Sequence, residues 1–290
     1  MTGVDAKTVE AIVHDFIPKL DALIPFHAPE VIGIDEVHGG VLQAAYLVIT
    51  DIKKRQLLEV SESGRSEEEV RRVLKTMTNH SNVQYGVTDM CKPYHNALTA
   101  ALPVKGTIVD KRHVLDLARK ALATVRTKVK KRMKKKNKKY LHRDRGILNK
   151  RRHELSDDEK KKITYWRKRF PTLGIAYDLK ETFYDIYDYG EAARALEAFE
   201  EWADSIPEEL EKEFGSVRDT FRDYQLEILA YFDTDKEITN APTEAINGLI
   251  KQIKRIGRGY KFETLRAKAL FKHGRWNEKE IYKYLRNSEN

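Results

Sequence analysis

Hydrophobic and polar residues alternate in three short segments near the start of the chain, a period of two that is typical of β-strands. The segments are VIGIDEV (31 to 37), VLQAAYLVIT (41 to 50) and QLLEV (56 to 60). Gly39-Gly40 separates the first two, and Lys53-Lys54 lies in a tight turn before the third. Because such short connections join antiparallel neighbours, the pattern predicts a three-stranded meander.

The segment from 66 to 109 switches between helical and extended patterns. Ser66 and Glu69 have capping-box spacing, and a stripe of apolar residues at helical spacing follows, namely Val70, Val73, Leu74 and Met77. Further patterns predict a strand at 83–88, a helix opened by Pro93 and a strand at 106–109. The first 30 residues predict one short helix. The elements predicted after it, over residues 31–109, have the order βββαβαβ.

After Asp110 the pattern is helical almost to the end. Helices are expected at 114–125, after a capping box at Ser156 and Glu159, near 243–256, at 262–271 and at 278–285, with others between proline and glycine breaks. We therefore predict a mixed α/β fold whose five-stranded sheet is interrupted by a large all-helical insertion. The expected parts are an N-terminal segment (1–30), the first part of the sheet domain (31–113), the insertion (114–238) and the helices that complete the domain (239–290).

Charge is strongly segregated along the 290 residues, although the net charge is only +9. Residues 111–170 carry 25 basic and 6 acidic side chains, whereas residues 178–237 carry 6 basic and 19 acidic ones. Within the basic region, 126–152 holds 15 Lys and Arg against the single Asp144. Such a block is typical of a phosphate-backbone contact, and the alternative is a surface element that docks onto the acidic region.

Other classes of protein are excluded by composition. The single Cys91 permits neither an internal disulfide nor a zinc knuckle, and no apolar run reaches the ~18 residues that a membrane span needs. No export signal is visible at the start. We expect a cytoplasmic, nucleoid-associated protein without a membrane partner or a small-molecule cofactor.

Three acidic residues stand where this layout lets them converge. Asp35 interrupts the apolar run of the first strand, Asp89 follows the 83–88 strand directly, and Glu244 opens the late helix. A carboxylate in a strand is costly to bury unless it is paired or binds metal, and hard oxygens suit Mg²⁺ or Mn²⁺. The alternatives are a salt bridge for Asp35, a helix cap for Asp89 and a helix-dipole partner for Glu244.

The late helix separates a polar face from an apolar one. At 100° per residue, Glu244, Asn247 and the cations Lys251, Lys254, Arg255 and Arg258 share one face. The other face holds Ile246, Leu249, Ile250, Ile253 and Ile256, which are expected to pack against the domain. An acid beside a row of cations suits a metal-bound phosphate with a polynucleotide running past it. Two ions about 3.5–4 Å apart would serve an in-line phosphodiester displacement.

Four segments in order carry a resemblance to a known family: GIDEV, VTDMCKPYHNAL, IVDKRHVLDLA and NAPTEAINGLIKQIKRIGRGYKFETLRAKAL. They resemble the DDE transposases of the ISL-three insertion-sequence group, with a wider likeness to Mutator-type transposases. The last segment is the most specific, and the resemblance covers about 31–271. It implies an RNase H-like fold with a helical insertion before the glutamate.

The resemblance also implies site residues and partners. Asp35, Asp89 and Glu244 would bind two Mg²⁺ or Mn²⁺ ions and catalyse cleavage and strand transfer at insertion-sequence ends. Asp110, His113 and Asn247 would surround them, and a homodimer or larger assembly on transposon-end and target DNA is expected. The residues expected to contact DNA are Lys251, Lys254, Arg255, Arg258, Lys130, Lys131, Arg132, Lys134, Lys135 and Lys136.

The chain departs from this family at its start and leaves alternatives open. Relatives commonly carry an N-terminal zinc-binding module and a helix-turn-helix, which 30 residues without a cysteine cannot hold. The rivals are a transposase remnant that only binds DNA, a nuclease without strand transfer and a helical RNA-binding protein. Trp166, Trp202 and their neighbouring aromatics would form a core or stack on unpaired bases. His95 is expected to be exposed, with a supporting place beside Asp89 as the alternative, and Cys91 is expected to be a small packing residue.

Overall fold

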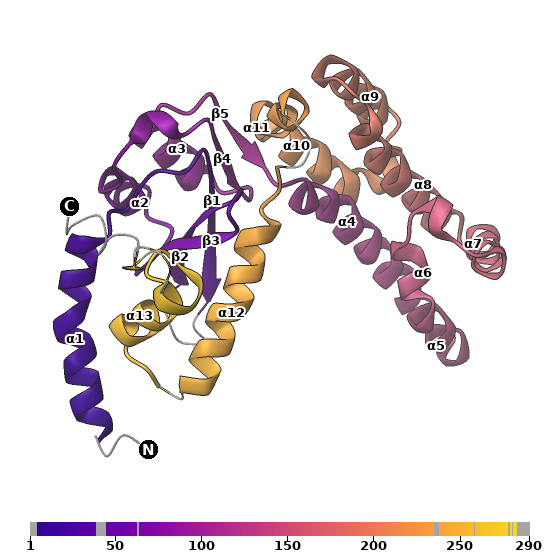
Figure 1. Ribbon diagram of the computed structural model, residues 1–290. Helices are drawn as coiled ribbons and strands as arrows, with labels where there is room; N and C mark the ends of the chain where they lie inside the picture. Colours follow the sequence, from indigo (N-terminus) through magenta and orange to yellow (C-terminus); the bar gives the residue numbers. More distant parts are fainter. Residues whose placement is uncertain are drawn as a thin grey trace. The chain divides into compact units, whose positions relative to one another are not determined.

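The computed structural model describes residues 5–38, 45–62, 64–234, 238–257, 259–277, 279 and 281–282. Contacts divide the chain into two compact units, one formed by residues 1–110 with 237–290 and the other by residues 111–236. The first unit is therefore built from two distant parts of the sequence (Figure 1). No helix in the described part of the chain is both long and apolar enough to span a bilayer.

A five-stranded mixed sheet forms the centre of the first unit. Its strands are β1 (Val31–His38), β2 (Ala45–Asp51), β3 (Gln56–Ser61), β4 (Tyr85–Thr88) and β5 (Gly106–Val109). They lie in the order β3-β2-β1-β4-β5. β1, β2 and β3 pair antiparallel, whereas β4 pairs parallel with both β1 and β5. The predicted fold class, an RNase H-like mixed sheet with flanking helices, is confirmed.

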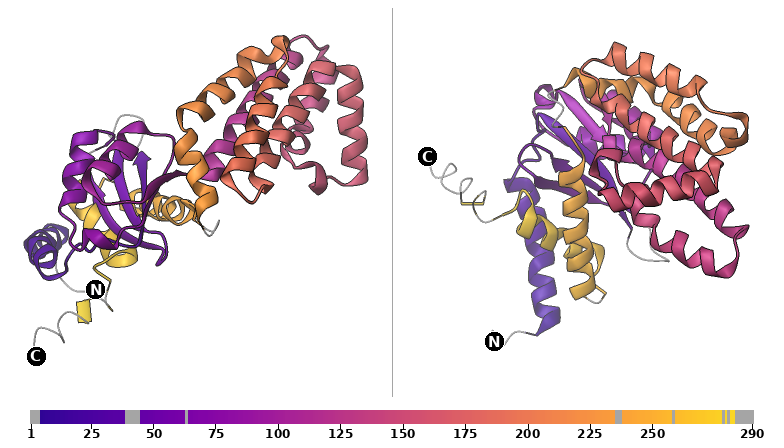
Figure 2. Two further views of the ribbon diagram at one scale, coloured as in Figure 1. Left: turned by 90° about the horizontal axis from the view of Figure 1, so that it is seen from above. Right: turned by 90° about the vertical axis from the view of Figure 1, so that its right-hand side faces the viewer.

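Helices cover both faces of this sheet (Figures 1 and 2). α2 (Glu67–Lys75) and α3 (Lys92–Ala101) pack on one face, where Ile32, Ile34, Leu74 and Leu98 share a core. α1 (Ala6–Leu23), α12 (Ala241–Gly257) and α13 (Phe262–His273) pack on the other, around residues that include Val37, Val48, Ile250, Leu265 and Trp276. Ile34 of β1 packs in the first core and Val37 in the second, on opposite faces of the sheet. Such a distribution follows from the period of two that the strand pattern predicted.

Several element boundaries differ from the sequence prediction. β4 begins at Tyr85 rather than at 83, because a 3-10 turn (His80–Asn82) is closed by a hydrogen bond from Val83 N to His80 O. Ser66 caps α2 through Glu69 N, as expected. The Gly39-Gly40 turn, the start of the second predicted strand at 41–44 and most of the helix predicted at 278–285 lie outside the described residues.

The second unit is helical throughout the part that the structure describes. It begins with α4 (Lys111–Lys131), which continues into the lysine-rich segment, as the sequence allowed. The remaining α-helices are α5 (Lys135–Arg143), α6 (Arg145–Asn149), α7 (Asp157–Arg169), α8 (Pro171–Asp185), α9 (Ala192–Asp204), α10 (Ser216–Asp223) and α11 (Gln225–Leu229). A π-helical turn (Glu211–Gly215) precedes α10.

Aromatic residues form the core of the second unit. Phe199 and Phe221 stack with ring centroids 3.7 Å apart, and Phe183 lies 4.7 Å from Trp202. The indole N–H groups are satisfied internally, since Trp166 donates to Asp144 and Trp202 to the carbonyl of Leu179. Both tryptophans are buried. Of the two interpretations of these aromatics, core packing is therefore the correct one for Trp166 and Trp202.

Candidate functional site

The sheet register brings three aspartates level with one another, with Asp35 inside β1 and the other two just beyond β4 and β5. Gly33 of β1 is aligned with Val87 of β4, and Val87 with Ile108 of β5. Two residues beyond these positions come Asp35, Asp89 and Asp110. Asp110 N extends the ladder by donating to Thr88 O at 3.0 Å. Because β1, β4 and β5 run parallel, their carboxyl ends meet where ligands of open α/β sheets collect.

α12 packs directly on this row through small and hydroxyl-bearing residues. A Cβ atom on Gly33 would lie 2.3 Å from Thr243 Oγ1 and 2.5 Å from Thr50 Oγ1, so only glycine lets the helix approach β1 this closely. The two hydroxyls hydrogen-bond to each other at 2.6 Å in a fully buried position. The first turns of α12 are thereby fixed over the strand that carries Asp35.

Asn247 joins α12 to Asp35. Its Nδ2 donates to Asp35 Oδ2 at 2.7 Å and to Glu36 O at 3.3 Å, while Glu36 N donates to the other carboxylate oxygen, Asp35 Oδ1, at 2.7 Å. Asn247 is 5% exposed, so the helical-wheel prediction was wrong to group it with solvent-facing cations. The contact of Asn247 with Asp35 orients that carboxylate.

Asn240, immediately before α12, holds Asp110 in the same way. Its backbone N donates to Asp110 Oδ2 at 2.9 Å, and its Nδ2 donates to Ile34 O at 3.2 Å. Both Asn240 and Asp110 are buried. The sequence analysis missed Asn240, although an asparagine just before a helix is a typical capping signal that could have drawn attention to it. This residue ties the ends of β1 and β5 to the start of α12.

Glu244 lies on α12 between the two asparagines, four residues after Asn240 and three before Asn247, so all three share one helical face. A carboxylate oxygen of Glu244 lies within 4.8 Å of one from Asp110. Among the described residues, Asp35 and Asp89 do not belong to a group of three or more ligands packed that closely. His113 follows Asp110 by one helical turn, on the first turn of α4, which belongs to the second unit.

Asp89 is positioned through its backbone by a buried histidine. His95 Nε2 lies 3.0 Å from Asp89 O, and His95 Nδ1 lies 2.9 Å from Thr107 Oγ1 on β5. The expectation that His95 is exposed was wrong, because its side chain is 3% exposed and spans α3, β5 and the end of β4. The cap of α3 is Cys91, without a side-chain hydrogen bond, so Asp89 does not serve as its capping side chain.

Cys91 is buried, as predicted for a small packing residue. Burial raises the pKa of its thiol, with a further contribution from the charge of Asp89. A raised pKa disfavours the thiolate, which is the nucleophilic form. The environment therefore agrees with a packing role rather than with nucleophilic chemistry.

The cations of α12 differ in their surroundings. Lys251 and Arg255 are exposed, whereas Lys254 is half-buried with its Nζ 5.2 Å from the Tyr46 ring centre, and burial lowers its pKa. Arg258 lies outside the described residues. Ile256, assigned to the buried face by the wheel, is 67% exposed, because the buried face of the helix ends at Ile253.

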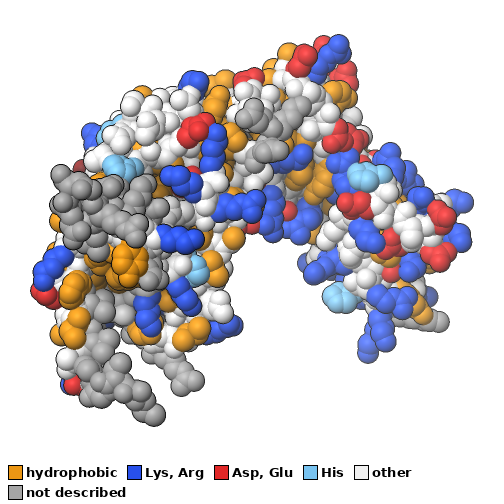
Figure 3. All heavy atoms as spheres, viewed as in Figure 1, with side chains coloured by type: hydrophobic (Ala, Val, Ile, Leu, Met, Phe, Trp, Pro, Cys, Tyr) orange, Lys and Arg blue, Asp and Glu red, His pale blue; other side chains and the backbone are white. Residues whose placement is uncertain are grey.

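The basic cluster of the second unit follows α4 and α5 (Figure 3). Lys131, Arg132, Lys134 and Lys135 are exposed and Lys130 is half-buried; the side chain of Lys136 is outside the described residues. Arg126 differs from them, because burial and the nearby charge of Arg145 lower its pKa. Its Nε and Nη1 find no hydrogen-bond partner among the described residues.

The donor set around the strand ends fits hard divalent cations. Asp35, Asp89, Asp110 and Glu244 offer carboxylate oxygens, and the buried Oδ1 atoms of Asn240 and Asn247 have no hydrogen-bond partner among the described residues. Oxygen ligands of this kind suit Mg²⁺ and Mn²⁺. An unsatisfied buried amide oxygen costs free energy unless something else binds it.

Comparison with known proteins gives one clear match. The model of a family described as transposase, the DDE type of the ISL-three group, matches residues 32–269. That range includes all of the aspartates described above, Glu244 and both asparagines of α12. None of the curated proteins matches the chain.

Proposed function

The chain belongs to the ISL-three group of DDE transposases, and we propose that its first unit cuts DNA at the ends of an insertion sequence and joins the freed 3′-hydroxyl to target DNA. The observation that carries the proposal is that Asp35, Asp89 and Asp110 lie level across three neighbouring strands, with α12 and its Glu244 packed against β1. A transposase acts on DNA, and a set of carboxylates at one sheet edge is the chemistry that phosphodiester transfer requires.

We assign Asp35, Asp89 and Glu244 as ligands of two Mg²⁺ or Mn²⁺ ions. Asp110 would complete the surroundings of Glu244. When bound, such ions supply an activated attacking oxygen and stabilise the leaving oxygen of the phosphodiester. The proximity of Asp110 and Glu244 supports a cation beside Glu244, because two carboxylates within 4.8 Å repel each other unless positive charge lies between them.

The other residues of the site would orient the ligands. Asn247 fixes one oxygen of Asp35 and the backbone of Glu36 the other, so the carboxylate has a single rotamer. Asn240 fixes Asp110, and His95 fixes the peptide carbonyl of Asp89. Outer contacts of this type typically change metal affinity or activity by about 10–100-fold when they are removed.

Basic residues outside the carboxylate cluster would hold DNA phosphates. Lys251 and Arg255 follow Glu244 along the exposed side of α12, with Lys254 and Arg258 assigned to the same role. In the second unit the proposed contacts are Lys130, Lys131, Arg132, Lys134, Lys135 and Lys136. Each phosphate contact releases a counterion and makes binding salt-dependent. Because transposition joins two ends, we propose that the active form is a dimer or a larger assembly on DNA.

Nicking of supercoiled plasmid in Mn²⁺ tests the metal site. Asp89→Asn and Glu244→Gln should each lower the nicking rate by more than about 100-fold. Glu263→Gln is the matched control, because Glu263 also lies in the first turn of a helix but is exposed on α13. Equal nicking by all variants would contradict the ligand assignment and favour a remnant that only binds DNA.

A second assay separates a transposase from a simple nuclease. An oligonucleotide duplex with a pre-cut 3′-hydroxyl end is incubated with a plasmid target and the wild-type protein. Covalently joined products are expected, and Glu244→Gln should abolish them. Nicking without any joined product would favour a nuclease that lacks strand transfer.

A further inference from the structure

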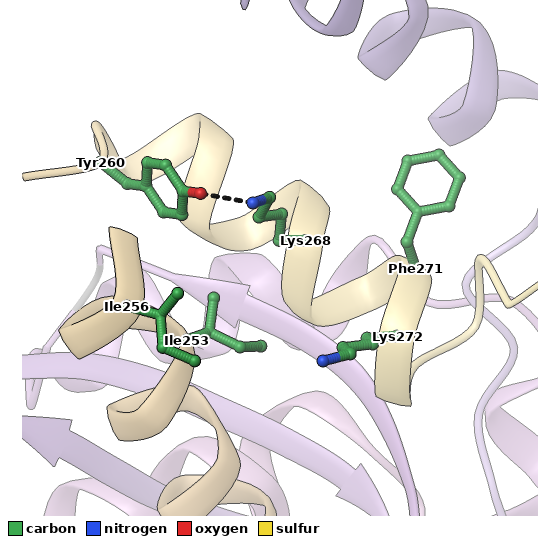
Figure 4. A pocket seen from close by; sticks show the side chains of 6 residues that line it. All are labelled: Ile253, Ile256, Tyr260, Lys268, Phe271 and Lys272. Carbon is green, nitrogen blue, oxygen red and sulfur yellow. Dashed lines mark hydrogen bonds between the residues drawn. The ribbon is translucent and has the colours of Figure 1, made fainter. Parts of the chain in front are cut away.

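An apolar hollow lies at the end of α12, far along the helix from Glu244. Its volume is about 330 Å³, and it is lined by Ile253, Ile256, Tyr260, Lys268, Phe271 and Lys272. Figure 4 shows Ile253 and Ile256 on α12 facing the lysines and the tyrosine beside α13. Ile256 is 67% exposed and Phe271 is 42% exposed, so this unit leaves large apolar side chains in contact with water here. Isolated exposed apolar residues are common, but these gather around a hollow.

The aromatic wall of this hollow is built by a close helix-end contact. A Cβ atom on Gly257 would lie 2.1–2.6 Å from three ring carbons of Tyr260, so the ring can lie against the end of α12 only because residue 257 is glycine. Lys268 Nζ donates to Tyr260 Oη and lies 4.4 Å from the ring centre. The ring is thereby held in one orientation, with a cation over it.

A second hollow of about 560 Å³ adjoins the first, and Lys272 lines both. Its other basic lining residues are Lys54, Arg55, His273 and Lys279. Of the described residues that line the two hollows, none is acidic; Asp51 pairs with Lys54 from outside at 3.6 Å. Burial and the charge of Lys272 lower the pKa of His273, as expected where cations crowd together. This pair of hollows therefore combines an apolar surface with one that carries an excess of positive charge.

We propose that the two hollows bind one unpaired nucleotide of a DNA strand, with the base in the apolar hollow and its phosphate in the basic one. The apolar volume is near the lower end of small-ligand sites, roughly 300–1,000 Å³, which suits a single base. Tyr260 offers a ring on which any base can stack, and the lysines complement the phosphate. A partner without negative charge would leave Arg55, Lys272 and Lys279 without a matching anion at this surface.

The position of the hollows defines which nucleotide would be bound. Ile256 follows Glu244 by twelve helical residues, or about 18 Å along the axis. One strand of duplex DNA advances about 3.4 Å per nucleotide, and an unpaired strand can extend further, so the bound nucleotide would lie at most about five nucleotides from the reacting phosphate. Lys251 and Arg255 lie between the two points and would follow the backbone. This inference rests on the proposed DNA-cleaving function, which it extends with a site for unpaired strand.

The test compares two fluorescein-labelled single strands of equal length and charge, dT12 and a 12-unit abasic deoxyribose phosphate, by fluorescence anisotropy in Ca²⁺. The full chain should bind dT12 about tenfold more tightly than the abasic strand. Ile256→Ser should remove this preference while leaving abasic binding unchanged, and Lys272→Gln should weaken both. Ile12→Ser is the control, since Ile12 is also a large exposed apolar residue but lies on α1, at 50% exposure.

Each contrary outcome has a distinct meaning. A wild-type preference for dT12 that survives Ile256→Ser would overturn the proposal. Competition by free thymidine monophosphate at micromolar concentration would assign the hollows to a small nucleotide instead. A change in sedimentation coefficient on Ile256→Ser, with the preference intact, would make the apolar hollow a protein contact. Plasmid nicking is measured separately, so loss of the base preference with intact nicking overturns this inference and leaves the proposed function standing.

Discussion

Asn247 Nδ2 donates to Asp35 Oδ2 at 2.7 Å, so a helix that returns after the insertion orients a carboxylate of the first strand 212 residues earlier. The same amide reaches Glu36 O, and its own Oδ1 is buried without a hydrogen-bond partner among the described residues. The two distant parts of the first unit are therefore joined at the candidate metal centre itself. The site as described therefore requires α12 to be docked onto β1.

Replacing this amide should impair the site more than the fold. Asn247→Ala leaves Asp35 without its donor, and we expect plasmid nicking to fall about 10–100-fold and stability by about 1–3 kcal/mol. Asn96→Ala is the matched control, because Asn96 Nδ2 donates to Glu67 Oε2 at 2.9 Å but on the exposed side of α3. Nicking that is unchanged by Asn247→Ala would show that Asp35 needs no such orientation.

Two glycines of the first unit should respond to alanine in opposite directions. Gly33→Ala drives a Cβ into Thr243 and Thr50, which should cost about 1–3 kcal/mol and displace α12 from Asp35. Gly248→Ala on α12 meets nothing within 4 Å and should stabilise the helix by about 0.5–1 kcal/mol. Urea unfolding measures both. Equal effects of the two substitutions would contradict the close packing of α12 on β1.

A partly buried charge network should make stability depend on pH. Arg266 and Arg275 both contact Asp21 on α1 and Glu59 on β3. Burial alone would raise the pKa of Asp21, but the hydrogen bonds and charges of the two arginines outweigh it and hold the pKa below its ordinary value. A lowered carboxyl pKa stabilises the fold above pH about 4, and the contribution is lost as pH falls through the folded-state pKa.

The difference in urea midpoint between wild type and Asp21→Asn should therefore be full at pH 7 and shrink below pH 4. Asp15→Asn is the control, because the Asp15–Lys19 pair is exposed and contributes little at either pH. A difference for Asp21→Asn that grows as the solution becomes more acidic would contradict the network.

Lysines of the second unit should differ in their contribution to DNA binding. The double variant Lys131→Gln with Lys135→Gln removes two exposed cations of the basic cluster, and the slope of log affinity against log salt should fall by up to about 1.8. Lys160→Gln with Lys161→Gln is the control, because those lysines pair with Asp157 and Asp158 on the same helix. Equal slopes for both double variants would indicate that the 126–152 segment is not a preferred phosphate contact.

Local pattern was sufficient to predict most of the sheet, because strand alternation and capping signals act over a few residues. It also singled out Asp35, whose charge interrupts an apolar strand, and Asp89 at a strand end. The proximity of Asp110 and Glu244 required the pairing of β4 with β5 and the docking of α12, which no local pattern encodes.

The errors have physical reasons of the same kind. His95 resembles a surface residue in sequence, yet two hydrogen bonds satisfy its buried ring. Ile256 continues the apolar stripe of α12, but the helix extends past the sheet it covers, and this isoleucine is left exposed. Asn240 escaped notice because its role consists of contacts with Asp110 and Ile34, over 100 residues away in sequence.

The claim that carboxylates from β1, β4 and α12 form one metal centre is tested most directly by Mn²⁺ titration followed by electron paramagnetic resonance of the free ion. Wild type and the Glu263→Gln control should each bind two ions per chain. Asp35→Asn, Asp89→Asn and Glu244→Gln should each lose at least one ion or weaken binding more than about tenfold. Identical Mn²⁺ binding by wild type and the three ligand variants would contradict the account.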